Sequence, residues 1–384
     1  MDPDIPYLLL TPGPLSTTRT VRQAMLHDYS TWDVDYNAQV NELRQRLIRL
    51  ATIESGVEET GHLEDYTAVL MQGSGTFAVE ATIGSAVPPT GKVLVISNGK
   101  YGARLAEIVR RLQIPLVEYI QPEVSPPDLT ELRAKLEADP EITHVTMVHC
   151  ETTTGMLNPA AEVGRIVKET GRVYIVDAMS SFAGYPMSME TLSADYLISS
   201  ANKCIEGVPG FGFIIARRDL LERTKGWARS LSFDLYDQWQ EMEKNHGKFR
   251  YTSPTHVVLA CLQALHELTQ EGGIVARHAR YTENQRTLVE GLRKIGLQTL
   301  LPDEYQSVII TSVLYPDSEN FSFPNFYDRM KSKRFVLYPG KVSDADTFRV
   351  GNIGHVYPDD IRLLVKTIRE TLVEMGVDLP ETGA

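Results

Sequence analysis

The chain alternates short apolar runs with amphipathic segments between residues 66 and 217. The apolar runs are rich in branched residues and flanked by turn residues, as is typical of buried strands. They cover residues 67–71, 92–96, 144–148, 173–176, 196–198 and 211–215. Helical patterns lie between several of them, at residues 77–87, 101–112, 129–138 and 162–170. This alternation predicts a mostly parallel sheet that is covered by helices on both faces.

The pattern changes after Arg217. Two long helical stretches are followed by alternating short strands and helices, which predicts a smaller α/β domain. The predicted elements are helices at 255–270, 275–295, 323–333 and 359–375 and strands at 308–313, at 335–337 and around Phe348. The two prolines in Thr11-Pro-Gly-Pro14 predict an extended N-terminal arm, because proline fixes φ and lacks a donor. We expect an arm at 1–20, a large domain at 21–255 and a small domain at 256–384.

Composition excludes several classes of function. The net charge of −12 disfavours nucleic acid and anionic membranes as partners, so an anionic substrate needs a local cationic site. No apolar run approaches the roughly 20 residues of a membrane span. Cys150, Cys204 and Cys261 are widely spaced and odd in number, which argues against disulfides or a metal site and favours a reducing cytoplasm. The acidic start of the chain, Met1–Asp4, does not have the basic region of a signal peptide.

Two residues at the ends of successive predicted strands suggest the chemistry. Asp177 ends the run at 173–176, and Lys203 follows the run at 196–198 and precedes a segment rich in glycine and proline. The carboxyl ends of parallel strands open into the crevice where α/β proteins bind ligands. A desolvated lysine is nucleophilic toward aldehydes, and an acid can hold a pyridinium nitrogen protonated. Individually, Asp177 could be a turn or helix-cap residue and Lys203 a surface lysine, but together they suit pyridoxal phosphate.

A phosphate site is predicted at the start of the helix at 77–87. Gln72-Gly-Ser-Gly-Thr-Phe77 follows a strand and opens that helix, where backbone N–H groups favour an anion. Ser200 and Asn202, beside Lys203, could donate to the same phosphate. Alone, this glycine motif is weak evidence for anion binding.

Three further residues have both a functional and a structural interpretation. Tyr101 starts a helix, where it could stack on the pyridine ring or simply pack. Thr152, in Glu151-Thr-Thr-Thr-Gly155, could reach the 3-oxygen of the ring or cap a helix. Arg349 lies between apolar neighbours in a predicted strand, so it must be paired, either in a structural ion pair or with an anionic substrate.

Together these motifs resemble the class V branch of the fold-type I pyridoxal-phosphate enzymes. The matching stretches are residues 8–15, 31–33, 72–75, 148–159, 174–181, 199–211, 234–239, 252–256, 338–343 and 348–354, in the right order over nearly the whole chain. Thr-Thr-Thr-Gly-Met-Leu-Asn-Pro at 152–159 and Asp-Leu-Tyr-Asp-Gln-Trp at 234–239 are the most specific. They resemble the members of the family that use 2-aminoethylphosphonate as amino donor and pyruvate as acceptor.

The resemblance implies a large domain with a mostly parallel, seven-stranded type of sheet, a smaller C-terminal domain, and a homodimer with active sites at its interface. It implies that Lys203 holds the cofactor, that Asp177 is the partner of the pyridinium nitrogen and that Tyr101 is the stacking ring. The remaining implied roles are phosphate binding by Ser74, Gly75, Thr76, Ser200, Asn202 and the neighbouring subunit's Thr252, a position near the ring oxygen for Thr152, and substrate binding by Arg349, Pro12 and Gly13. The acidic segment 54–61 is expected to be a surface loop.

Other functions remain as alternatives. The first is another class V aminotransferase, of the alanine–glyoxylate type, which physical reasoning alone does not separate. A cysteine desulfurase or lyase would need a nucleophilic cysteine on a mobile loop, whereas Cys204 adjoins Lys203 on a constrained segment. A regulatory protein of the same fold would need an added DNA-binding domain or a lost lysine, and the negative charge does not suit DNA.

Overall fold

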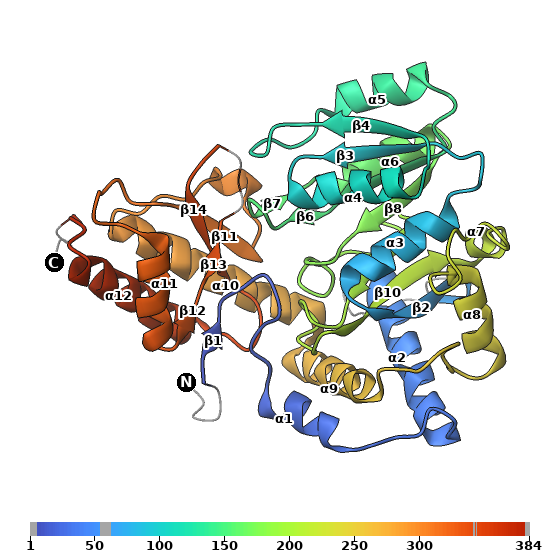
Figure 1. Cartoon of the computed structure of the whole chain (residues 1–384), viewed down its shortest axis with the longest axis horizontal. Coiled ribbons are helices and arrows are strands. Elements are labelled where there is room, and N and C mark those ends of the chain that lie inside the picture. Colours follow the sequence, from blue (N-terminus) through green and yellow to red (C-terminus); the bar gives the residue numbers. More distant parts are fainter. Residues whose placement is uncertain (1–5, 54–62, 341, 343, 381–384) are drawn as a thin grey trace.

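The computed structural model describes residues 6–53, 63–340, 342 and 344–380. The chain forms a large α/β lobe and a smaller C-terminal lobe, and the N-terminal strand lies against the smaller lobe (Figure 1). The acidic segment 54–61, which we expect to be a surface loop, lies outside the described residues.

The large lobe is built on a seven-stranded sheet with the order β2-β10-β9-β8-β5-β3-β4. The strands are β2 (Tyr66–Gly73), β3 (Val93–Ser97), β4 (Leu116–Ile120), β5 (His144–Val148), β8 (Val173–Asp177), β9 (Tyr196–Ser200) and β10 (Gly210–Arg217). β10 runs antiparallel to both of its neighbours, and the other pairs are parallel. The predicted mostly parallel sheet is therefore confirmed, and all six predicted runs lie in it. β4 has no predicted counterpart, because this edge strand is only partly buried and Glu118 interrupts its apolar run.

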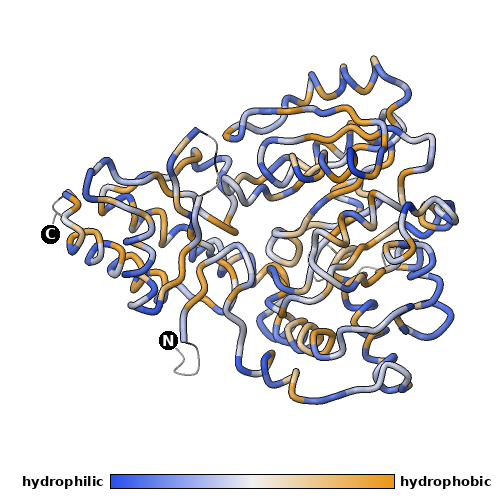
Figure 2. Tube along the Cα trace, in the orientation of Figure 1, coloured by the Kyte–Doolittle hydropathy of each residue, from blue (hydrophilic) through white to orange (hydrophobic). Residues whose placement is uncertain are grey.

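Helices cover both faces of this sheet. They are α1 (Arg19–Gln23), α2 (Val34–Thr52), α3 (Gly75–Ala86), α4 (Lys100–Arg111), α5 (Leu129–Ala138), α6 (Ala160–Glu169), α7 (Arg218–Glu222), α8 (Leu235–Lys244) and α9 (Thr255–Glu271), with short 3₁₀ turns at Ala24–Leu26 and Leu63–Asp65. Alternate residues of a strand face opposite sides. Tyr174 and Val176 accordingly join the core beneath α2, α5, α6 and α9, while Ile175 joins the core beneath α3, α4 and α8. Apolar positions concentrate in the sheet and polar positions on the outer helices (Figure 2).

The smaller lobe combines three helices with a three-stranded antiparallel sheet of order β11-β14-β13. Its elements are α10 (Gly273–Lys294), a 3₁₀ turn (Asp303–Tyr305), β11 (Ile310–Leu314), α11 (Phe323–Ser332), β12 (Phe335–Val336), β13 (Tyr338–Pro339), β14 (Thr347–Gly351) and α12 (Pro358–Glu374). The predicted small α/β domain thus has the expected composition of elements. The domain limits at residues 20 and 255 stay predictions.

The N-terminal arm pairs with the smaller lobe. β1 (Leu8–Leu9) lies parallel to β12, and Leu8 and Leu10 are buried in the core of that lobe. The Gly351 N–H at the end of β14 donates to the Leu10 carbonyl at 2.9 Å. The arm therefore belongs structurally to the smaller lobe, although it lies at the opposite end of the sequence.

Within the described residues, every helix is either too short or too polar to cross a membrane.

Candidate active site

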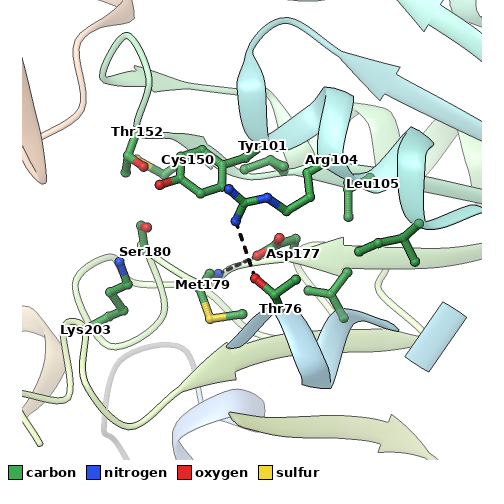
Figure 3. Close-up of a pocket in the computed structure, with 13 residues that line it drawn as sticks. Thr76, Tyr101, Arg104, Leu105, Cys150, Thr152, Asp177, Met179, Ser180 and Lys203 are labelled. Carbon is green, nitrogen blue, oxygen red and sulfur yellow. Dashed lines mark hydrogen bonds between the residues drawn. The ribbon is translucent and has the colours of Figure 1, made fainter. Parts of the chain in front are cut away.

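A pocket lies at the carboxyl ends of β5 and β8 and beside the first turns of α3 and α4 (Figure 3). Its lining combines the predicted acid, lysine and aromatic ring with a set of apolar and polar neighbours. The lining residues are Thr76, Val79, Tyr101, Arg104, Leu105, Ile108, Val148, Cys150, Thr152, Asp177, Met179, Ser180 and Lys203. This is the strand-end crevice that the sequence pattern predicts.

Asp177 is the last residue of β8 and is buried, with 7% of its surface exposed. Its Oδ1 accepts a hydrogen bond from the Met179 N–H at 2.9 Å. Burial raises the pKa of Asp177 to about 6, although that N–H bond and the Lys203 charge oppose the rise. A cationic nitrogen placed against this carboxylate would offset the cost of its burial.

Lys203 follows β9 and projects its amine into the pocket (Figure 3). Its Nζ donates to the Pro12 carbonyl of the N-terminal arm at 2.5 Å. Burial lowers the pKa of Lys203, and the nearby positive charge of Arg349 lowers it further. Gly13 packs so closely that a Cβ there would lie 2.9 Å from the lysine Nζ.

The predicted phosphate site lies at the first turn of α3. Ser74 is the N-cap of this helix, and its side chain makes no capping hydrogen bond. A Cβ at position 75 would lie 2.3 Å from the Met179 sulfur, so a larger residue there would have to displace the Met179 side chain. Thr76 follows, with its hydroxyl at the pocket. This arrangement leaves the start of a twelve-residue helix available to an anion.

Tyr101 lies in the first turn of α4, and Arg104 lies one turn further along. The Arg104 guanidinium carbon is 4.8 Å from the centre of the Tyr101 ring, and its Nη1 donates to the Thr76 hydroxyl at 3.4 Å. The buried Glu151 carboxylate accepts the Tyr101 N–H and the Gly102 N–H, each at 3.1 Å. This carboxylate fixes the start of α4 and, with it, the position of the Tyr101 ring.

Arg349 lies in β14 of the smaller lobe and is 1% exposed. Its Nη1 donates to the Thr152 carbonyl at 2.6 Å and its Nε to the Pro339 carbonyl at 3.0 Å. Among the described residues, its Nη2 is a buried polar atom with no hydrogen-bond partner. Burial lowers the pKa of Arg349. Within the described residues, the Arg349 side chain contacts backbone carbonyls and the Tyr338 ring. It makes no ion pair with these residues, so the structural ion pair considered from the sequence is not observed among them.

The structure brings together some predicted site residues and leaves others outside the pocket lining. Thr76, Tyr101, Thr152, Asp177 and Lys203 line it. Those outside the lining are Ser74, Gly75, Ser200, Asn202, Thr252, Arg349, Pro12 and Gly13, although Pro12, Gly13 and Arg349 contact residues that line it.

Three of the residues outside the lining, Ser200, Asn202 and Thr252, direct their side chains elsewhere or lie at the surface. The Ser200 hydroxyl donates to Asn202 Oδ1 at 3.0 Å, which turns both side chains toward each other. Thr252 is exposed in the loop before α9.

Sequence reasoning did not identify four lining residues that carry polar or polarisable groups: Arg104, Cys150, Met179 and Ser180. Arg104 is three residues from Tyr101, and helix spacing puts these two on one face, so a signal was present. Cys150, which lies in the two-residue strand β6 (Cys150–Glu151), and Met179 and Ser180, which lie in the turn after β8, have no comparable pattern.

Comparison with known proteins identifies a family. A family model described as aminotransferase class-V matches residues 7–322. The chain is 57% identical over 374 residues to a 2-aminoethylphosphonate–pyruvate transaminase of Syntrophobacter fumaroxidans, covering 97% of this chain and 98% of that protein. A protein of the same name from Bacillus cytotoxicus is 55% identical, with 96% and 98% covered.

Solved structures agree on the fold. The pyridoxamine–pyruvate aminotransferase of Mesorhizobium loti superposes with a TM-score of 0.86 at 22% identity, covering 98% of this chain and 94% of that one. An alanine–glyoxylate aminotransferase of a Nostoc species has a TM-score of 0.84 at 25% identity, with 95% of each chain covered. The predicted fold class is thereby confirmed, and the chain belongs to the class V aminotransferase family.

Proposed function

We propose that this enzyme transfers the amino group of 2-aminoethylphosphonate to pyruvate, giving phosphonoacetaldehyde and L-alanine in phosphonate degradation. The observation that carries the proposal is the identity of 55–57%, over nearly the full length of both chains, to proteins named for that reaction. The buried acid and arginine and the pocket lysine described above are the groups that such a reaction requires.

Pyridoxal 5'-phosphate is the proposed cofactor, and the site fits it. Lys203 would hold its aldehyde carbon, Asp177 its ring nitrogen and Tyr101 a face of its ring. The phosphate would lie at the start of α3, with Gly75, Thr76, Ser74, Ser200 and Asn202 around it. The supporting observation is the buried Asp177 carboxyl group, which makes no ion pair with the described residues, opposite a lysine whose pKa burial lowers. When bound, the cofactor supplies the electron sink for the carbanion.

Lys203 would have two tasks. Its amine would hold the cofactor until the donor amine takes its place, and the freed amine would then move the proton from the donor carbon that carries the nitrogen to the carbon that Lys203 had held. Its lowered pKa favours the neutral, basic amine that this proton transfer needs. Asp177 would keep the ring nitrogen protonated throughout. In the second half-reaction Lys203 would move a proton in the reverse direction, to the carbonyl carbon of pyruvate, which becomes the α-carbon of alanine.

Arg349 would bind the acid group of each substrate, the phosphonate first and the carboxylate of pyruvate second. Its Nη2 is buried and has no hydrogen-bond partner among the described residues, so it would gain one from an oxyanion that enters beside it. A guanidinium matches such oxygens with two parallel hydrogen bonds. Pro12 and Gly13, which contact Lys203, would border the donor between its two ends.

We further propose a homodimer in the cytoplasm, with Thr252 of each subunit completing the phosphate site of the other. Thr252 is exposed in the single chain, next to the exposed Tyr251.

Among other enzymes of this fold, a cysteine desulfurase is disfavoured by the thiols. Cys150, Cys204 and Cys261 are all buried, and burial raises the pKa of each. A raised pKa leaves little thiolate, which is the nucleophilic form. An alanine–glyoxylate aminotransferase would use the same residues, so substrate preference decides between the two.

The test is a donor panel with pyruvate or glyoxylate as acceptor. 2-Aminoethylphosphonate, alanine, β-alanine and serine are compared by kcat/KM in the wild type, Arg349→Ala and Arg349→Lys. The phosphonate should be preferred, and Arg349→Ala should lose about 1.5–3 kcal/mol of binding to the oxyanion, or about ten- to a hundredfold in kcat/KM. Lysine should rescue only partly, because it keeps the charge but not the planar pair of donors.

Two results would contradict the proposal in different ways. A higher kcat/KM for serine or another amino acid would overturn the phosphonate assignment and leave the class V aminotransferase. Unchanged half-reactions in Arg349→Ala would show that the anion binds elsewhere.

A further inference from the structure

A buried carboxylate outside the pocket lining stabilises the turn that carries Lys203. Glu206 lies three residues after Lys203, and its N–H donates to the Lys203 carbonyl at 2.7 Å. Its φ is +67°, and it is only 5% exposed. A residue other than glycine adopts this left-handed conformation only where its surroundings impose it.

Helix α10 supplies those surroundings. The Tyr281 hydroxyl donates to Glu206 Oε1 at 2.5 Å, and Arg280 Nη2 donates to the same oxygen at 2.8 Å. Arg277 Nη1 donates to the Cys204 carbonyl at 2.8 Å and to the Ile205 carbonyl at 3.2 Å. One helix therefore holds both the side chain and the backbone of the lysine turn.

The charges in this cluster balance. Glu271, at the end of α9, accepts from Arg277 Nε at 2.8 Å and from Arg280 Nε at 2.7 Å. Two arginines thus face two carboxylates, and the two arginine side chains are 2% and 10% exposed. Removing one member would leave an uncompensated buried charge. The four side chains therefore favour a single arrangement over a set of similar ones.

The same helix also holds the segment that follows Arg349. Arg280 Nη1 donates to the carbonyls of Gly354 at 2.7 Å and Val356 at 3.0 Å. Asn284 Nδ2 donates to the Asn352 carbonyl at 3.1 Å and to the Val356 carbonyl at 3.0 Å. Figure 1 shows α10 extending from the large lobe into the smaller one. Arg280 therefore bonds to both the lysine turn and the chain leaving β14.

We propose that Glu206, Arg277 and Arg280 are positioning residues that fix the span between Lys203 and Arg349, and thereby the length of the amino donor. This inference rests on the proposed function, in which Lys203 takes the amine end of the donor and Arg349 takes its acid end. A donor with one more carbon needs the two ends further apart. The cluster resists that displacement, because it would break several buried charged contacts at once.

The experiment compares 2-aminoethylphosphonate with 3-aminopropylphosphonate, which is one carbon longer, in the cofactor-loaded enzyme. The variants are Glu206→Gln, Arg280→Gln and Arg280→Lys. Glu283→Gln and Arg286→Gln are the matched controls, because this pair lies on the same helix and is exposed. The preference for the shorter donor is the ratio of the two kcat/KM values. This ratio should fall by about tenfold in the Glu206 and Arg280 variants, because a displacement of about 1 Å can cost up to a hundredfold in rate. The controls should keep the wild-type ratio.

A second measurement separates positioning from stability. The absorbance of the imine between Lys203 and the cofactor is titrated with pH in each variant, together with its Tm. Displacement of the lysine turn should shift the imine pKa in the cluster variants and not in the controls. A lowered Tm with an unchanged imine pKa and an unchanged donor ratio would overturn the proposal and leave a purely structural cluster.

The remaining outcomes also decide. If Arg280→Gln does not fold, Arg280→Lys replaces it in the test. The lysine retains the positive charge but loses the paired contacts to Gly354 and Val356. A wild type that does not use 2-aminoethylphosphonate would contradict the proposed function; the imine titration would then still decide whether these residues position Lys203.

Discussion

Lys203 and Asp177 show how burial prepares single residues for chemistry. Burial lowers the pKa of the lysine and raises that of the aspartate to about 6. Both shifts disfavour the charged forms, because a charge is costly where water is excluded. A neutral lysine amine can attack an aldehyde. A carboxylate whose charge is destabilised by burial binds a cationic ring nitrogen strongly.

Lys203→Ala should abolish the absorbance of the lysine–cofactor imine and all turnover, since Lys203 is the one lysine among the described residues that line the pocket. Borohydride reduction of the wild-type enzyme followed by peptide mapping checks the assignment. A pyridoxyl group on a different lysine would contradict it.

Asp177→Asn should reduce kcat far more than it weakens cofactor binding, because an amide cannot stabilise a protonated pyridine nitrogen. In contrast to kcat, the free energy of unfolding of the cofactor-free variant should increase. The raised pKa means that the folded protein binds more protons than the unfolded chain between pH 4 and 6, so this group's contribution to stability falls as pH rises through that window. At pH 8 the cofactor-free variant should therefore be more stable than the wild type, by up to about 3 kcal/mol.

Urea unfolding of both proteins at pH 8 and turnover of the loaded enzymes provide the measurements. Asp195→Asn is the matched control, because Asp195 is also buried with a raised pKa but does not line the pocket. Normal kcat in Asp177→Asn would count against the assigned role.

At the scale of elements, the N-terminal arm lies over the lysine. Its Pro12 carbonyl accepts the Lys203 amine, while its strand β1 pairs with β12 of the smaller lobe. Gly13 has a φ of +120° and no room for a side chain beside the lysine. The arm thus joins the smaller lobe to Lys203.

Gly13→Ala should reduce kcat/KM by about tenfold or more, because its methyl group would displace the Lys203 amine. Gly226→Ala serves as control, since Gly226 also has a positive φ but nothing near its Cβ position. Steady-state kinetics and Tm are measured for both variants. Equal losses of activity in the two would show that backbone strain, rather than the contact with Lys203, limits activity.

Two elements of the large lobe show different reasons for incomplete prediction. In α2 the buried positions Tyr36, Val40, Leu43 and Leu47 follow helical spacing, so the sequence contained a signal that the predicted elements omit. β4 is only partly buried and Glu118 interrupts its apolar positions, so it does not show the unbroken apolar run by which the other strands were predicted. Burial of both faces is what makes the other strands recognisable from apolar runs.

At the scale of the whole molecule, exposed apolar side chains surround the segment that carries Thr252. Leu26, Trp32 and Val34 are 78%, 79% and 81% exposed, and Tyr251 is 53% exposed. The His256 Nε2 lies 3.0 Å from an Asp28 oxygen. This contact connects the segment around Thr252 with the segment that carries Leu26 and Trp32. Exposed apolar groups of this size are typical of an interface between subunits.

Trp32→Asp should weaken the proposed homodimer and reduce cofactor affinity together, because each subunit would lose the other's Thr252. Val373→Asp, an equally drastic change at an exposed site on α12, is the control. Sedimentation velocity and cofactor titration over a dilution series provide the measurements. A fully active wild-type monomer would contradict the proposed shared site.

The sequence by itself determined the mostly parallel sheet, the smaller lobe and the residues at the ends of β8 and β9. Those features depend on local periodicity and on strand-end position, which a single chain displays directly. It also supplied the family motifs that the relatives bear out.

Only the tertiary structure decided which distant groups meet. Arg349 reaches the Thr152 carbonyl across 197 positions, the Pro12 carbonyl accepts from Lys203 across 191, and Arg280 joins Glu206 to Gly354. These contacts arise where the two lobes and the arm pack together. Their partners are mostly backbone carbonyls, which every residue carries, so no pattern of side chains along the sequence identifies them.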